Sequence, residues 1–321
     1  MFTVIKRKIL DFIAAQKLKQ NYHRNKNGTS KEGMSKKVVF TIFLILFLVQ
    51  SFICIFPLLW CISNALRPNQ EYLGNPNSLF TSWHFEYIVP AIKAVHYATN
   101  QRATFIGAIF NSFWFAFGTQ FLNILASLFV AYPLARYNFP GRGFFYGIII
   151  FRITVPIVGT SAVGYKLELA LNMINNPPIY MIGAFNGFDM NALIMYGYIK
   201  AVSKEYSEAA FLDGASALQV LFKVVVPQAF PCALALYVNS VMGQWNNYNA
   251  FLVSLTEFPN LAVATYNMQN GLTFADTGGY GSINNALFYW VVLLSGIVPL
   301  VLFAASQKLM IKNMAVGGLK G

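Results

Sequence analysis

One short stretch, GQWNNYN from Gly243 to Asn249, concentrates side chains that could bind a polar ligand. Carboxamides donate to and accept from hydroxyl groups, and aromatic faces pack against the apolar faces of sugar rings. The stretch therefore suits a carbohydrate, and its candidate contacts are Gln244, Trp245, Asn246, Asn247 and Tyr248. Two other roles stay open, namely hydrogen bonds to neighbouring helices and an aromatic belt at a membrane interface.

Three more polar residues, Arg152, Asn186 and Asp189, stand within apolar surroundings and are candidates for the same pathway. An arginine at membrane depth is costly and by default marks a pathway or a buried pair. The alternative for Arg152 is a position near the membrane interface. Asn186 and Asp189 precede an apolar run, Ala192 to Ala201, that is too short to cross a bilayer alone. The helix there must start near Met181 and carry both polar residues, or be broken.

Reactive motifs are missing from the sequence. It contains no GxxxxGK[ST] phosphate loop, no HExxH and no GxSxG. The three histidines and three cysteines have no metal-site or CxxC spacing. We therefore expect no catalytic residue, no metal and no cofactor bound by this chain, so energy for uphill movement must come from elsewhere.

The composition is that of an integral membrane protein. Of 321 residues, 56% are hydrophobic and 11% are charged, with a mean hydropathy of +0.51, whereas soluble domains carry about 25% charged residues. The net charge of +12 does not indicate nucleic acid, because 10 of the 23 lysines and arginines lie in residues 1–37. A basic block before a first span keeps an N-terminus cytoplasmic and near anionic lipid.

Six membrane spans are predicted, with both termini in the cytoplasm. With this topology most lysines and arginines fall on the cytoplasmic side, as the positive-inside rule requires. The predicted spans are Val38–Ser63, Thr104–Ala135, Phe144–Tyr165, Met181–Ala201, Ala229–Leu255 and Ala286–Ile311.

Between and beside the spans, the sequence predicts five other parts. The tail 1–37 is either an interfacial amphipathic helix or partly disordered. Residues 64–103 and 256–285 form external segments large enough to dock a partner, or solvated connectors. Residues 202–228 form a cytoplasmic loop, and 312–321 a cytoplasmic C-terminal tail. Residues 104–311 form the membrane core around these loops.

The cytoplasmic loop 202–228 reads as a helix-turn-helix. Glu208 lies near the start of a helix, where the macrodipole favours a carboxylate, and Gly214 can take the positive φ that ends it. Ser216-x-x-Gln219 is a capping-box pattern for a second helix. Pro227 marks the bend into the fifth span. One face of this second helix is predicted to hold Leu218, Leu221, Phe222 and Val225.

This loop resembles the EAA loop of permease subunits of ATP-binding-cassette importers. The match consists of Glu208-Ala209-Ala210, three residues, Gly214, nine residues, and Val224-x-Val226-Pro227. Four further stretches, LRPNQEYLGNP, NSFWFAFGTQFLNILASLFVAYPLARYNFPGR, GQWNNYNAFLVSL and MAVGGLKG, are similar to the carbohydrate-uptake branch. The resemblance covers nearly the whole chain.

The resemblance implies an all-α type I importer fold in the bacterial plasma membrane. It implies a second permease, two ATPase subunits that use ATP and Mg²⁺, and an extracellular or periplasmic solute-binding protein that the segment 256–285 would contact. The EAA loop would dock in a cleft of the ATPase through its motif residues, which are Glu208, Ala209, Ala210, Asp213, Gly214 and Pro227. The expected cargo is a carbohydrate, an oligosaccharide by similarity.

Two alternatives remain open from the sequence. One is an importer of another small solute, such as peptides or amino acids. The other is a non-transport membrane protein, for which no reactive constellation is visible. The residues do not identify the sugar, its length or its linkage.

Overall fold

The computed structural model describes residues 36–155, 160–271 and 284–317, and every regular element in those ranges is a helix. The chain divides into two units, residues 1–61 and 62–321. In the first unit the described residues are helical and belong to the helix Lys36–Leu66. The predicted tail 1–37 lies almost entirely outside the described residues.

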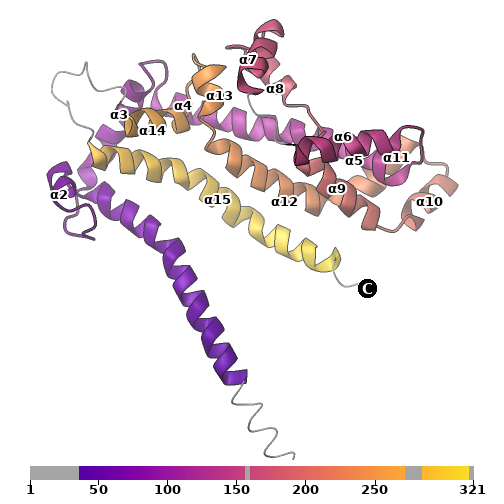
Figure 1. Cartoon of the computed structure of the whole chain (residues 1–321), viewed down its shortest axis with the longest axis horizontal. Helices are drawn as coiled ribbons and strands as arrows, with labels where there is room; N and C mark the ends of the chain where they lie inside the picture. The colour runs from indigo at the N-terminus through magenta and orange to yellow at the C-terminus, as the bar shows by residue number, and fades with distance from the viewer. Residues whose placement is uncertain (1–35, 156–159, 272–283, 318–321) are drawn as a thin grey trace, which may run out of the picture. The chain divides into compact units, whose positions relative to one another are not determined.

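The second unit contains all the labelled helices (Figure 1). In chain order they are α2 Asn69–Gly74, η1 Phe85–Tyr87, α3 Ile88–Ala98, α4 Phe105–Phe113, η2 Trp114–Gly118, α5 Thr119–Arg136, α6 Arg142–Thr154, α7 Thr160–Ala170, α8 Pro177–Gly183, α9 Met190–Ala201, α10 Glu205–Leu212, α11 Ala217–Val220, η3 Leu221–Val225, α12 Val226–Trp245, α13 Asn249–Val253, α14 Leu261–Gln269 and α15 Asn285–Gly317.

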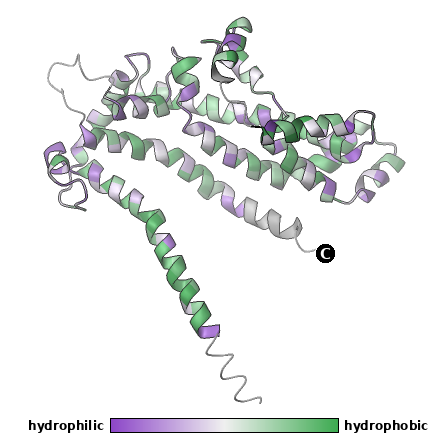
Figure 2. Ribbon diagram, in the orientation of Figure 1, coloured by the Kyte–Doolittle hydropathy of each residue, from purple (hydrophilic) through white to green (hydrophobic). Residues whose placement is uncertain are grey.

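Four helices in the described ranges are long and apolar enough to cross a membrane. They are Lys36–Leu66, Phe105–Arg136, Ala217–Trp245 and Asn285–Lys308, and Figure 2 shows them as mostly apolar ribbons. They correspond to the first, second, fifth and sixth predicted spans. The fifth begins and ends earlier than predicted, because its helix runs from Ala217 to Trp245 and the short α13 replaces the last predicted residues.

The third and fourth predicted spans are interrupted. Helices α6 and α7 lie where one span was expected, and α8 and α9 replace the other. Of the two possibilities for the fourth span, the structure has the broken helix. The break has a local cause, since Asp189 has extended backbone and its carboxylate accepts the Ala192 N–H as the N-cap of α9.

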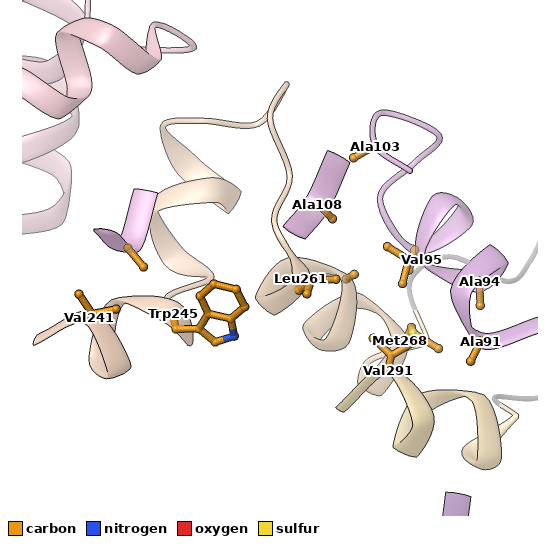
Figure 3. Close-up of a cluster of buried hydrophobic side chains, with 13 residues drawn as sticks. Ala91, Ala94, Val95, Ala103, Ala108, Val241, Trp245, Leu261, Met268 and Val291 are labelled. Carbon is orange, nitrogen blue, oxygen red and sulfur yellow. The ribbon is translucent and has the colours of Figure 1, made fainter. Parts of the chain in front are cut away.

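Small side chains allow the helices to pack closely. One buried cluster joins α3, α4, α12, α14 and α15 (Figure 3). Ala91, Ala94, Ala98 and Ala108 belong to it, and Figure 3 shows Trp245 at the opposite end of the cluster from Ala91 and Ala94. Small side chains let the helix backbones approach closely, so this cluster can pack densely.

The described parts of the two predicted external segments contain helices and side-chain contacts. Arg67 is fully buried, and its guanidinium donates to the carbonyl oxygens of Asn75 (3.0 Å) and Pro76 (3.2 Å) and to Asn64 and Ser78. Asn267 of α14 donates to the Ala98 carbonyl of α3 at 2.8 Å. The two external segments are thereby joined.

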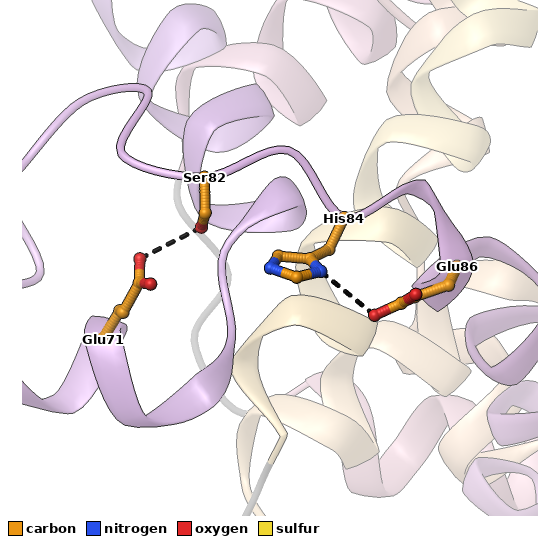
Figure 4. A network of polar contacts seen from close by, with 4 residues as sticks. All are labelled: Glu71, Ser82, His84 and Glu86. Atoms are coloured by element: carbon orange, nitrogen blue, oxygen red, sulfur yellow. Dashed lines mark hydrogen bonds and ion pairs between the residues drawn. The ribbon is translucent and has the colours of Figure 1, made fainter.

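Polar contacts between residues close in sequence also stabilise the predicted external segment 64–103. The Glu71 carboxylate accepts the hydroxyls of Thr81 (2.9 Å) and Ser82 (3.0 Å), and His84 Nδ1 contacts Glu86 Oε1 at 3.0 Å (Figure 4). This contact is the one ion pair among the described residues, and it requires a protonated His84.

Candidate functional site

A polar cavity of about 830 Å³ lies between α7, α8, α12 and α13 in the second unit. Its walls carry tyrosines, carboxamides and hydroxyl groups, together with the aliphatic side chains of Ala250 and Val253. They are formed by Gln120, Gly164, Tyr165, Glu168, Tyr180, Ser240, Gly243, Gln244, Asn246, Asn247, Tyr248, Asn249, Ala250, Val253 and Ser254. Such walls offer both hydrogen bonds and aromatic faces to a hydroxyl-rich ligand.

Four of the five residues predicted in GQWNNYN line this cavity, namely Gln244, Asn246, Asn247 and Tyr248. Asn247 also builds the local fold, because its Nδ2 donates to Gln244 Oε1 at 2.8 Å and its Oδ1 accepts the Ala250 N–H. The Tyr248 ring stacks on Tyr266, with centroids 4.5 Å apart. These contacts hold the wall of the cavity in one conformation.

Trp245 is the exception, because it does not line the cavity. Its side chain is only 2% exposed and lies in the cluster of Figure 3. The indole N–H donates to the Ser295 carbonyl oxygen at 3.0 Å, which ties α12 to α15. One residue along an α-helix rotates the side chain by about 100°, which turns Trp245 away from the direction of Gln244, so the structure gives it a packing role.

The broken fourth span is held by polar side chains. Arg152 Nη1 donates to Asn186 Oδ1 (2.8 Å) and to the Phe188 carbonyl (2.9 Å). Asn123 of α5 donates to the Asn186 carbonyl and to Asp189 Oδ2, both at 2.9 Å. Arg152 is thus hydrogen-bonded to the break, and the carbonyl oxygens of Asn186 and Phe188 accept hydrogen bonds from side chains.

A smaller cavity of about 260 Å³ extends from the main one toward this break. It shares Gln120, Glu168, Tyr180, Gln244 and Asn247 with the larger cavity, and Asn186 also lines it. The predicted residues Arg152 and Asp189 therefore contact the cavity region through Asn186 and Asn123 rather than directly.

Glu168 was not among the residues predicted from sequence, yet it lines both cavities. Its Oε2 accepts the hydroxyl of Ser254. In the sequence, Glu168 could have been noticed as the one carboxylate in the mostly apolar stretch 160–170. Only the tertiary fold, however, places it in the same cavity wall as Gln244.

The EAA loop, residues 202–228, has the predicted local structure. α10 ends in a Schellman motif, in which the Ala215 N–H donates to Ala210 and the Gly214 N–H to Phe211, both at 3.0 Å. Gly214 has φ +83°, the left-handed conformation that glycine favours. Ser216 and Gln219 form the capping box that starts α11.

The second half of the EAA loop continues into a membrane helix without interruption, as the range Ala217–Trp245. A π-helical turn, η3, precedes Pro227, which stands inside α12 rather than between two helices. Leu221 and Val225 are buried against α5 and α9, whereas Leu218 and Phe222 are exposed. The four residues predicted on one face therefore divide between the core and the surface.

The turn between α10 and α11 presents apolar and acidic side chains to the surface. Leu212 is 89% exposed, and the other exposed apolar residues are Tyr206, Phe211 and Leu218. Glu208, Ala209, Asp213 and Gly214 are exposed as well, whereas Ala210 is half-buried. An exposed apolar patch rimmed by polar residues is typical of a protein-binding surface.

Two other predictions concern the external loop 256–285 and metal binding. Residues 272–283 of the predicted external loop 256–285 lie outside the described residues, although α14 belongs to its first half. Across the described ranges, histidine, cysteine, aspartate and glutamate form no group that could hold a metal ion.

Comparison with known proteins agrees with this architecture. Residues 123–316, more than half of the chain, match the model of the family described as binding-protein-dependent transport system inner membrane component. The chain is similar to the arabinooligosaccharides transport system permease protein of Halalkalibacterium halodurans (27% identity, covering 84% of this chain and 93% of the relative). It is also similar to the galactooligosaccharides transport system permease protein of Bacillus subtilis (24% identity, 89% and 96%).

A solved structure shows the same fold. A chain of a bacterial ABC transporter involved in the import of the acidic polysaccharide alginate superposes with a TM-score of 0.65 at 20% identity, covering 85% of this chain and 97% of that one. The family match, which includes the entire EAA loop, identifies the role. The chain belongs to the family of binding-protein-dependent transport system inner membrane components, and it is a permease subunit of an ABC transporter, not an enzyme.

Proposed function

We propose that this permease carries a carbohydrate, an oligosaccharide by similarity to its relatives, through the cavity lined by Gln244, Asn247 and Tyr248. The observation that supports the proposal is the chemistry of the walls, because tyrosine faces and carboxamides surround a volume of about 830 Å³. Relatives whose names specify arabinooligosaccharides and galactooligosaccharides support the same class of cargo.

The proposed assembly contains a second permease, two ATPase subunits that bind ATP and Mg²⁺, and an external solute-binding protein. Six spans with both termini in the cytoplasm are part of the proposal, with the interrupted helices α6–α7 and α8–α9 completing the third and fourth. Their polar breaks would face the second permease or a water-filled cavity, where such breaks are tolerated.

The EAA loop would receive the work of ATP hydrolysis from the ATPase. Its exposed turn, with Glu208 and Leu212, would bind the ATPase cleft, and the continuous helix Ala217–Trp245 would carry displacement to the cavity wall at Gln244. Burial of Leu221 and Val225 against α5 and α9 makes the loop stiff enough to transmit force.

The class of cargo can be tested by ATPase stimulation in the assembled complex. The complex with its ATPase and second permease is placed in proteoliposomes, and its binding protein is supplied with neutral oligosaccharides, peptides or amino acids. We expect several-fold stimulation with an oligosaccharide. Stimulation by peptides or amino acids alone would overturn the carbohydrate assignment and leave the EAA coupling standing.

A further inference from the structure

Among the described residues that line the cavity, one is charged. The larger and the smaller cavity are both lined by Glu168, and neither is lined by a lysine or an arginine. The remaining polar groups are neutral carboxamides, hydroxyls and phenols. A single unit charge among neutral dipoles dominates the local potential.

No cation neutralises this carboxylate within the part of the chain that the structure describes. The ion pair found there is that of His84 with Glu86. Glu168 Oε2 accepts the Ser254 hydroxyl, a neutral donor, and no described side chain donates to Oε1. Lys166 is on the same helix but does not line the cavity.

Two charged groups behind the wall have opposite signs. Arg152 and Asp189 reach the cavity region only through Asn186 and Asn123. Their contributions to the potential inside the cavity oppose each other, so the sign of the potential is set by Glu168.

On these observations, and resting on the proposed function, we infer that Glu168 is a charge-selectivity residue: the cavity admits neutral or cationic saccharides and repels anionic ones such as uronic acids. A sugar carboxylate in the cavity would meet a like charge without a counter-ion, which disfavours it. A neutral sugar hydroxyl can instead donate to the open Oε1 of Glu168.

The potential can be measured with a thiol placed in the cavity wall. Val253 lines the cavity, is 52% exposed and adjoins Ser254, so Val253→Cys supplies the probe in a background where Cys54, Cys61 and Cys232 are replaced by alanine. In the assembled complex, the reaction rates with a cationic and an anionic methanethiosulfonate reagent are compared. We expect Glu168→Gln to lower the cation-to-anion rate ratio by about tenfold.

Two variants separate charge from structure. Ser254→Ala removes the hydrogen bond and keeps the carboxylate, so the ratio should stay near that of the parent. Glu257→Gln removes an exposed carboxylate that does not line the cavity, so it too should leave the cation-to-anion rate ratio near that of the parent. An unchanged ratio in Glu168→Gln, or an equal fall in Ser254→Ala, would overturn the inference.

The charge selectivity is then measured by comparing the uptake of a neutral and an anionic saccharide. The probes are a neutral oligosaccharide and its analogue with one primary alcohol oxidised to a carboxylate, chosen so that the binding protein still holds it. Glu168→Gln should raise uptake of the analogue relative to the neutral sugar by about tenfold, and a constant ratio would refute the selectivity. If the unmodified importer takes up no saccharide, the proposed function fails instead, whereas the thiol measurement still reports on Glu168.

Discussion

At the residue scale, Gly187 shows how closely the broken fourth span packs on α5. A Cβ at this position would lie 2.4 Å from the carbonyl oxygen of Ala126, a backbone atom that cannot turn away. The neighbouring Asn186 and Asp189 accept hydrogen bonds from Asn123 of the same helix. Close approach and polar contacts together fix the break beside the smaller cavity.

Gly187→Ala should therefore destabilise the complex by about 1–3 kcal/mol, the usual cost of overpacking. The measurement is the thermal midpoint of the purified complex in detergent. Gly197→Ala in α9 is the matched control, because a Cβ there meets nothing within 4 Å and alanine favours a helix. Equal midpoints for the two variants would contradict the close packing.

Residues whose role is local were predictable from sequence, and residues whose role is tertiary were not. Gly214 and Ser216 act on backbone groups within five residues, so the motif alone locates the Schellman turn and the capping box. Trp245 and Glu168 depend on which helix lies opposite. From the sequence, Trp245 was predicted to contact the carbohydrate together with its polar neighbours. In the structure its indole is hydrogen-bonded to Ser295 and lies in the core.

At the element scale, the EAA loop combines a rigid base with an exposed tip. Its base, α11 and η3, packs on α5 and α9 through Val220, Leu221 and Val225. Its tip at Leu212 contributes little to the fold of this chain, since most of the side chain is solvent-accessible. The tip is the part that can enter another protein.

Leu212→Ser should weaken binding of the ATPase on the order of tenfold, because burial of a leucine contributes about 1.5–3 kcal/mol. Titration of the ATPase onto the permease pair in nanodiscs measures this affinity. Leu73→Ser, at a leucine 66% exposed on α2, is the control and should leave the affinity unchanged. The docking surface is misplaced if Leu212→Ser binds the ATPase as tightly as the parent.

Element boundaries were predictable where apolar runs are long. The helices Phe105–Arg136 and Asn285–Lys308 follow from hydropathy alone. The ends of the helices in the interrupted pairs α6–α7 and α8–α9 could not be predicted fully from hydropathy, because they depend on polar contacts such as that of Arg152 with Asn186. Sequence indicated a break in the fourth span as one of two options and did not indicate α7 as a separate helix.

At the scale of the whole molecule, one helix connects the proposed ATPase-binding turn with the proposed solute cavity. The range Ala217–Trp245 begins at the EAA turn and ends beside the cavity residues Gln244 and Asn246. In the proposed function this helix couples the two sites, and work done on the loop would displace the cavity wall.

The central claim is that the EAA turn couples ATP hydrolysis to saccharide movement, and Gly214 tests it through backbone conformation alone. At φ +83°, valine is strained, whereas asparagine tolerates the left-handed region. No atom lies within 4 Å of a Cβ there, so either side chain fits in the isolated chain.

The decisive measurement is ATP-driven, binding-protein-dependent uptake of a labelled neutral oligosaccharide by the complete importer in proteoliposomes. We predict uptake in the parent, most of that uptake in Gly214→Asn, and at least a tenfold loss in Gly214→Val. Uptake by Gly214→Val at the parent rate, or parental uptake that does not require ATP, would contradict the account.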